Sequence, residues 1–420
     1  MEPMIPRREM LSAGTALVGA AALASRTAAA DRKDDRSRLL DTYLKSIQPS
    51  SDDVDAWLKR RRYPFCRYDS ELGYLHIDRD FKEGLGGAVC RYRYDKLDAR
   101  QMHAYADQPC RINTYGNSFT SCEQVSDGET WQEVLARHLC EPVRNYGIGG
   151  YSVYQSYLRM IREEKRAPAR VIVFNIFDDD HYRNILGWQR FKFGVNDISI
   201  NPTVPYMVVD PDKREVLYRE NPCPTPRSIN RLTDLAWVRR TFGDNVYLAS
   251  RLQRMIDKNA GKKVPATDYD DDALNRYGLF ATNAIIDRVK EYGEKTGKKI
   301  LFVLSYGGYI VQQFIDTGRR FDQPMVDHLQ KLGVPHVDLL KAHALDRRQF
   351  RISTTNYVRR FFVGHYNPLG NHFCAFATVK SLAGLLDPPP ASHSTPPLMP
   401  RPRRLGNRRE VLVEHSAARG

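Results

Sequence analysis

The feature of this sequence that most constrains its fold is a pair of continuous apolar runs, at residues 171–174 and 300–304. Side chains of a strand point alternately to its two faces, so a strand without polar alternation must be covered on both faces. Five segments of the 420-residue chain favour strands, and helix-permissive stretches separate them: residues 111–115, 142–146, 170–177, 299–305 and 335–339. This alternation predicts an α/β fold with three layers, α/β/α, around a mainly parallel five-stranded sheet.

Local signals place several other elements along the chain. Ser126 and Glu129 form a capping-box pattern ahead of an amphipathic helical stretch, and Ser152 precedes another helical stretch. From about residue 185 to residue 272 the rhythm of strands and helices is interrupted, and residues 202–224 favour a β-hairpin. We therefore predict an insertion after the third strand, near the rim of any site at that edge of the sheet.

Glycine and polar residues follow the predicted strands where these strands end. Gly116, Asn117 and Ser118 follow the first strand, Gly150 closes the turn after the second, and aspartates 178–180 follow the third. Glycine lets the chain turn sharply, so the hydroxyl of Ser118 can be presented at the end of its strand. Sites in parallel α/β folds lie outside the carboxyl ends of the strands. We expect these residues to meet there.

A histidine block near the C-terminus completes the set, with His365 in residues 364–370, which open the last predicted helix. Blocks of Ser, Gly, Asn and His in this order resemble those of the SGNH hydrolase (GDSL esterase/lipase) superfamily, over roughly residues 105–387. The resemblance implies a flavodoxin-like SGNH hydrolase fold and an esterase without cofactor or metal. It also implies Ser118 as nucleophile, His365 as base, and the backbone N–H groups of Ser118 and Gly150 as the oxyanion hole.

The sequence departs from the family pattern at two positions. Phe362 stands where an Asp usually orients the histidine, and spoiling that Asp costs about 10⁴ in turnover in a serine protease. A backbone carbonyl or a carboxylate from elsewhere in the chain could orient His365 in its place. Asp179 stands where an Asn usually supplies a third oxyanion donor, although an ionised carboxylate would repel an oxyanion. Asn175 is an alternative donor, and the remaining candidates for the cleft are Asn117, Asp178 and His181.

These residues favour an exported serine hydrolase that cleaves a carbohydrate O-acyl ester or another short-chain ester. One alternative is an O-acyltransferase, which would pass the acyl group to an extracellular polysaccharide with the same residues. The other is a non-catalytic carbohydrate-binding protein that retains the fold, which Phe362 and Asp179 would explain. A metal site is not expected, because side chains of the run at residues 178–181 would splay apart and no second ligand cluster is evident.

The ends of the chain carry the signals for localisation. Arg7 and Arg8 precede an apolar run at residues 11–24 and alanines at 28–30, a pattern typical of a twin-arginine export signal. We expect cleavage near Ala30 and a periplasmic or extracellular protein without stable membrane insertion, the alternative being an uncleaved N-terminal anchor. The predicted parts are a signal peptide (1–30), an N-terminal helix with an irregular extension (31–108), the SGNH hydrolase-like domain (109–387) and a disordered Pro/Arg-rich tail (388–420).

Charge and cysteine content limit the classes of ligand and binding partner that the sequence favours. The formal net charge is +14, but no dense basic stripe or nucleic-acid-binding motif accompanies it, so we expect no nucleic-acid partner. The seven cysteines show no C-x-x-C spacing, so a zinc site is not expected, and their pairing stays open. The expected partner is a small-molecule or carbohydrate ester, and the oligomeric state is open.

Overall fold

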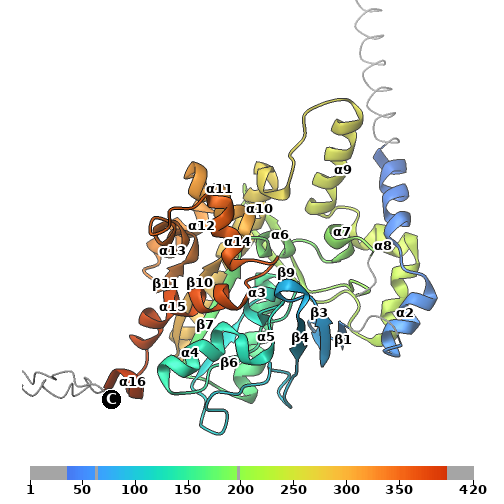
Figure 1. Ribbon diagram of the computed structural model, residues 1–420. Coiled ribbons are helices and arrows are strands. Elements are labelled where there is room, and N and C mark those ends of the chain that lie inside the picture. Colours follow the sequence, from blue (N-terminus) through green and yellow to red (C-terminus); the bar gives the residue numbers. More distant parts are fainter. Residues whose placement is uncertain (1–35, 62–64, 196–198, 395–420) are drawn as a thin grey trace, which may run out of the picture.

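The computed structural model describes residues 36–61, 65–195 and 199–394 (Figure 1). The predicted signal peptide, residues 1–30, lies outside the described residues, as do residues 395–420 of the predicted tail. Residues 388–394 of that tail are described, and they include the short helix α16 (Ala391–Ser394). Within the described ranges, no helix is both long and apolar enough to cross a bilayer.

A five-stranded parallel sheet forms the centre of the molecule. Its strands are β5 (Ile112–Tyr115), β6 (Arg144–Asn145), β7 (Val171–Phe177), β10 (Lys299–Ser305) and β11 (His336–Asp338), in the spatial order β11-β10-β7-β5-β6. All neighbouring strands run parallel. The predicted α/β fold and all five predicted strands are confirmed. Counted along the chain, the order is 2-1-3-4-5, in which the winding direction reverses between β5 and β7, and ligands bind at such a switch point.

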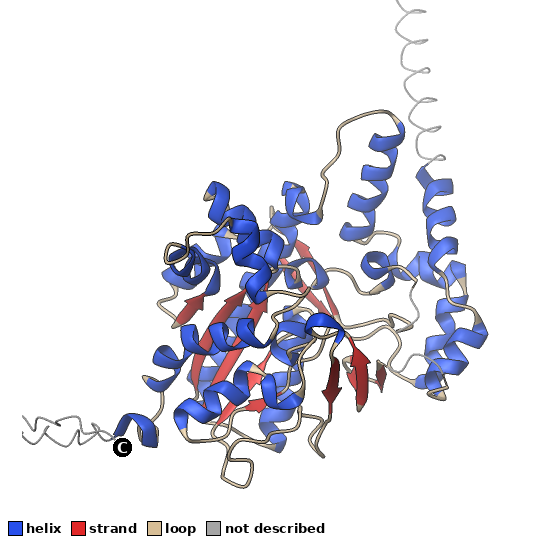
Figure 2. Ribbon diagram, in the orientation of Figure 1, coloured by secondary structure: helices blue, strands red, loops and turns tan. Residues whose placement is uncertain are grey.

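Helices cover both faces of this sheet (Figure 2). Val171 and Val173 of β7 join one hydrophobic core, whereas Ile172 and Phe174 join the other. The first face is covered by α4 (Trp131–Leu139) and α15 (Pro368–Ala383), and the second by α5 (Val153–Arg166), α10 (Asp272–Thr296) and α12 (Gln323–Lys331). This burial on both sides explains the continuous apolar runs of β7 and β10.

Most of the shorter helices of the main domain follow the strands at their carboxyl ends. They are α3 (Ser118–Ser121), α6 (Asp180–Arg183), α11 (Gly308–Thr317) and α13 (Leu339–Arg347), whereas α14 (Thr354–Phe361) follows α13. The capping box at Ser126 and Glu129 caps the 3₁₀ turn η2 (Asp127–Glu129), and Thr130 caps α4. The amphipathic helix therefore begins a few residues after the predicted cap.

The N-terminal extension packs against the main domain. It contains helical residues 36–47, α2 (Ser51–Leu58), the hairpin of β1 (Cys66–Asp69) and β2 (Gly73–His76), the turn η1 (Leu85–Gly87), and the pair β3 (Arg79–Lys82) and β4 (Val89–Tyr92). The hydroxyl of Tyr74 donates to the carbonyl of Gly149 at 2.7 Å. Buried Arg100 donates to the carbonyl of Cys122, just after α3, at 2.6 Å. The extension therefore reaches the loops at the carboxyl edge.

The insertion after β7 contains the predicted hairpin, in which Tyr206 pairs with Arg219 and Asp210 with Glu215. Its elements are α7 (Arg190–Phe193), β8 (Tyr206–Asp210), β9 (Glu215–Arg219), η3 (Pro226–Thr233), α8 (Leu235–Phe242), α9 (Val246–Asn259) and η4 (Asp268–Asp270). The hydroxyl of Tyr43, in the N-terminal extension, donates to the carbonyl of Phe191 at 3.2 Å. Extension and insertion thus pack together.

All seven cysteines are free thiols.

Candidate active site

The turn after β5 places Ser118 at the carboxyl edge of the sheet. Gly116 has a φ of 153°, and a Cβ there would lie 2.2 Å from Oγ1 of Thr120, so only glycine fits this turn. Asn117 caps α3, since its side chain accepts a hydrogen bond from the N–H of Phe119. Ser118 is the first residue of α3 and is 5% exposed. The local sequence therefore holds a nearly buried serine beside the switch point between β5 and β7.

Two backbone N–H groups near Ser118 are available as donors. In the described part of the chain, neither the N–H of Ser118 nor that of Gly150 donates a hydrogen bond. Gly150 has a φ of 80°, and a Cβ there would lie 2.6 Å from Oη of Tyr74. Gly147, in the same loop, approaches α3 so closely that a Cβ would lie 2.1 Å from the backbone N of Ser121. The loop after β6 is therefore packed on the serine helix, as an oxyanion hole built from both segments requires.

His365 lies beside α3, in the connection between α14 and α15. Its backbone N–H donates to Oε1 of Gln124 at 2.6 Å. Gly364 permits this contact, because it has a φ of 119° and a Cβ would lie 2.7 Å from the same oxygen. The imidazole ring centroid is 5.0 Å from that of Phe119, which follows Ser118 in the chain. Among the described residues, no hydrogen bond joins the hydroxyl of Ser118 to His365.

The environment of His365 favours its neutral form. Burial lowers its pKa to about 4, although the charge of Glu83 acts in the opposite direction. At neutral pH the ring is therefore unprotonated and can accept a proton, as a general base must.

Glu123 supplies a carboxylate near His365 that the sequence analysis did not predict. Its Oε2 lies 3.8 Å from Nε2 of His365, which is too long for a hydrogen bond but close enough for a substantial charge interaction. Phe362, at the position of the usual Asp, packs its ring against Tyr366 at 4.7 Å between centroids. The only signal for Glu123 in the sequence was its place shortly after the predicted serine turn at residues 116–118.

The N-terminal extension surrounds the same carboxylate. Oε1 of Glu123 lies 3.7 Å from Nη2 of Arg79, on β3, and 3.9 Å from Nε2 of His76, on β2. None of these three atoms has a hydrogen-bond partner in the described ranges. Burial raises the pKa of Glu123, and the charges of Arg79 and Arg100 oppose that rise. Residues from a segment without any recognisable motif therefore contribute to the electrostatics of the site.

Asp180, after β7, supports the turn that precedes Ser118. Its Oδ1 accepts hydrogen bonds from Nδ2 of Asn117 at 2.8 Å and from Nη1 of Arg183 at 2.9 Å. Its Oδ2 accepts one from the N–H of Phe177 at 3.2 Å. Burial raises the pKa of Asp180 to about 7, although Arg183 opposes this shift. Asn117, which we predicted to line the cleft, is thus bound to the interior carboxyl of Asp180.

Asp179 and Asp178 are also engaged in the protein. Asp179 forms ion pairs with Arg183 at 2.7 Å and with Lys192 at 2.8 Å. Burial alone would raise its pKa, but Lys192 and Arg183 outweigh burial and lower the pKa to about 2. An ionised carboxylate cannot donate a hydrogen bond. Asp179 therefore does not offer the oxyanion donor that its position in the SGNH hydrolase pattern suggested. Oδ1 of Asp178 accepts a hydrogen bond from the hydroxyl of Tyr269 at 2.9 Å.

Asn175 and His181 lie in the interior. The amide of Asn175 donates to Oγ1 of Thr120 at 3.0 Å and accepts from the hydroxyl of Ser305 at 2.8 Å, which ties α3 to the sheet. Nδ1 of His181 lies 2.9 Å from Oγ1 of Thr282 on α10, and burial lowers the pKa of His181 to about 4. Within residues 36–61, 65–195 and 199–394, no three His, Cys, Asp or Glu side chains are arranged to hold a metal ion.

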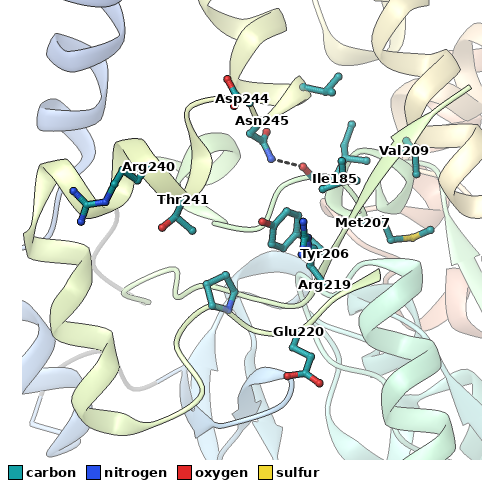
Figure 3. A pocket seen from close by; sticks show the side chains of 13 residues that line it. Ile185, Tyr206, Met207, Val209, Arg219, Glu220, Arg240, Thr241, Asp244 and Asn245 are labelled. Carbon is teal, nitrogen blue, oxygen red and sulfur yellow. Dashed lines mark hydrogen bonds between the residues drawn. The ribbon is translucent and has the colours of Figure 1, made fainter. Parts of the chain in front are cut away.

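A cavity of about 520 Å³ lies within the insertion (Figure 3). The hairpin β8–β9 lines one side, and the turn between α8 and α9 lines another, where Asn245 donates to the carbonyl of Ile185 at 2.7 Å. Its lining includes four charged residues: Arg219, Glu220, Arg240 and Asp244. None of the predicted site residues lines this cavity, so we place the candidate active site at the carboxyl edge of the sheet.

No family model and no curated protein matches this sequence. Several solved structures are similar to it, among them the following three. A G-D-S-L family protein from Desulfitobacterium hafniense DCB-2 is 10% identical, with 64% of this chain and 98% of that chain covered and a TM-score of 0.33. The acetyl xylan esterase AlAXEase is 12% identical, with 64% and 98% covered and a TM-score of 0.35. LAE5, an alpha/beta hydrolase enzyme from the metagenome of Lake Arreo, Spain, is 12% identical, with 68% and 100% covered and a TM-score of 0.35. At identities and TM-scores this low, these similarities assign no function to this protein.

Proposed function

We propose that this protein is a serine hydrolase that cleaves an ester bond through an acyl-enzyme on Ser118. The observation that supports this most is the arrangement at the switch point of the sheet. There, Ser118 begins a helix after a turn that only glycine can make, and the backbone N–H groups of Ser118 and Gly150 are free to donate. His365, neutral through burial, lies beside the next residue of that helix.

The proposed reaction has two steps. The hydroxyl oxygen of Ser118 attacks the ester carbonyl carbon while its proton passes to His365, and the two N–H groups bind the resulting oxyanion. His365 then returns the proton to the leaving alcohol oxygen as the C–O bond breaks, which leaves an acyl group on Ser118. In the second step, water gives a proton to His365 and attacks the acyl carbon. His365 then returns this proton to the Ser118 oxygen as the bond between that oxygen and the acyl carbon breaks, which releases the acid and regenerates the hydroxyl of Ser118.

Glu123 is proposed as a positioning residue in place of the Asp that Phe362 replaces. A carboxylate 3.8 Å from the imidazole stabilises the imidazolium that forms when Ser118 loses its proton. The cationic neighbour Arg79, 3.7 Å from the other oxygen, opposes protonation of that carboxylate.

The proposed substrate is a carbohydrate O-acyl ester or another short-chain ester, met in the periplasm or outside the cell. The twin-arginine pattern of residues 7–30 supports this location. An O-acyltransferase would use the same residues and differ only in the acceptor of the acyl group. Product analysis with and without a sugar acceptor separates the two, since transfer gives an acylated sugar and hydrolysis gives the free acid.

The test is intact-mass spectrometry of the purified protein after treatment with a fluorophosphonate. A single adduct is expected on wild-type protein, and none on Ser118→Ala. Ser121→Ala is the matched control, because Ser121 lies on the same helix, is also buried, and has no hydrogen-bond partner for its hydroxyl among the described residues. Absence of an adduct on the wild type at neutral and mildly alkaline pH would refute the proposal and favour a non-catalytic glycan-binding protein.

A further inference from the structure

A large open cavity adjoins the candidate active site. Its volume is about 930 Å³, and it lies between the carboxyl end of β7, which contributes Phe177, and α9 with the connection to α10. The ring of Phe177 stacks on that of Phe119 at 4.2 Å between centroids, and Phe119 follows Ser118 in the chain. A ligand in this cavity would therefore contact Phe177, whose ring stacks on the residue that follows the proposed nucleophile.

Two cations of this cavity are neutralised by carboxylates of the protein. Nζ of Lys192 lies 2.8 Å from Asp179 and 2.6 Å from Asp268. Arg254 pairs with Asp268 at 2.7 Å. These four side chains form a network in the wall, with charges that balance one another, and the network fixes the shape of the cavity.

Two further cations in the lining are not neutralised. Arg251 and Lys258 lie on α9, seven residues and about two helical turns apart, and neither has a carboxylate partner in the described part of the chain. The guanidinium of Arg251 lies over the ring of Tyr43, 5.5 Å from the ring centroid, and Tyr43 belongs to the helical segment beside α9 (Figure 1). The lining therefore has a surplus of positive charge, and such a surplus attracts anionic ligands into a concave site.

A partly exposed aromatic ring adds to the binding surface. Tyr269 lines the cavity and donates its hydroxyl to Asp178 at 2.9 Å, whereas the ring of Tyr247 is buried behind the wall and its hydroxyl donates to Asp268 at 2.9 Å. These hydrogen bonds fix the rings in place. Rigid aromatic rings offer flat apolar surface at little entropic cost, and a few polar groups among them orient a ligand. Sugar rings have apolar faces that can pack on such surfaces.

We propose that this cavity binds an acidic glycan, in which a sugar ring packs on Tyr269 and a carboxylate or sulfate group pairs with Arg251 and Lys258. This inference rests on the proposed function and names the class of substrate that would bring its ester to Ser118.

The experiment measures binding by isothermal titration calorimetry with the full chain carrying Ser118→Ala, so that no ester is turned over. The probes are an oligogalacturonate, a sulfated oligosaccharide and a neutral xylo-oligosaccharide of equal length. At least one acidic probe is expected to bind more tightly than the neutral probe, and the two acidic probes distinguish carboxylate from sulfate. Its affinity should fall as salt is added, because the Debye length shortens from about 10 Å at 0.1 M to about 3 Å at 1 M.

Charge reversal tests the two unpaired cations. The double variant Arg251→Glu/Lys258→Glu should bind the acidic probe roughly tenfold more weakly or worse, as loss of two exposed ionic contacts implies. Arg319→Glu/Lys331→Glu is the matched control, since both residues are exposed, lie outside this cavity and change the net charge equally. This control should bind like the parent.

Three results would overturn the inference: no binding of either acidic probe, equal binding of the neutral probe, or unchanged binding by the Arg251/Lys258 variant. Failure of the proposed function gives a different result, because fluorophosphonate labelling is measured on Ser118 without any glycan. Acidic-glycan binding without labelling would retain the cavity assignment and remove only the hydrolase.

Discussion

Replacing Glu123 with Gln removes a negative charge 3.8 Å from Nε2 of His365 and keeps the shape of the side chain. At an effective dielectric constant of about 20, two unit charges at this distance interact by about 4 kcal/mol. The charge of Arg79, 3.7 Å from the other carboxylate oxygen, offsets part of this attraction. We expect the imidazolium to lose about 2–3 kcal/mol of stabilisation, which corresponds to a decrease in kcat/KM of roughly 30- to 150-fold.

The assay is hydrolysis of a short-chain p-nitrophenyl ester as a function of pH. Because burial raises the pKa of Glu123, protonation of its carboxylate should lower kcat/KM at a pH above the acid limb of His365, and Glu123→Gln should lack this decline. A merely structural role would change the amount of active protein without removing this decline. Glu123→Asp should restore part of the activity, since it restores the charge at a longer distance.

Glu129→Gln is the matched control for this substitution. Glu129 is exposed, lies in the same segment of the chain, and caps η2 with a side-chain oxygen that Gln also has. This variant should have wild-type kinetics. If Glu123→Gln kept kcat/KM within about threefold of wild type and retained the decline at a pH above the acid limb of His365, Glu123 would not be coupled to His365.

Three further predictions concern the turn, the aspartate network and the base. Gly116→Ala should destabilise the protein by about 2 kcal/mol or more and abolish labelling, because its Cβ would lie 2.2 Å from Oγ1 of Thr120 at a φ of 153°; thermal denaturation checks this. Asp179→Asn should cost about 3 kcal/mol at neutral pH by leaving Lys192 without its full partner, yet leave labelling of the folded protein intact. The folded-state pKa of Asp179 is lowered from 3.8 to about 2, so the stability difference between wild type and Asp179→Asn should shrink as pH falls through that range. If the folded Asp179→Asn variant lost fluorophosphonate labelling, Asp179 would have a role in the oxyanion hole. For wild-type protein, the pKa of about 4 at His365 places the acid limb of kcat/KM near pH 4, and a limb near an ordinary histidine pKa would contradict the assignment of the base.

The sequence by itself determined the layers of the fold and the positions of Ser118 and His365 along the chain. Continuous apolar runs required a sheet covered on both faces, and all five strands lie where these runs and shorter segments placed them. Gly116 and Gly364 were readable because a sharp turn leaves a local trace in residue type. Periodicity and turn residues report the conformation of a segment, and a parallel sheet then sends all carboxyl ends to one edge.

Only the tertiary structure decided which polar groups meet. Glu123 approaches His365 because two loops, more than two hundred residues apart in the chain, pack together at the carboxyl edge. Arg79 comes to the same carboxylate from β3, in an extension without any motif. Asp179 looked like a possible donor, but its pairing with Lys192 across the insertion fixes it as an acceptor. The physical reason is that hydrogen bonds and ion pairs depend on distances of a few ångströms between side chains, and local sequence patterns carry no information on such distances.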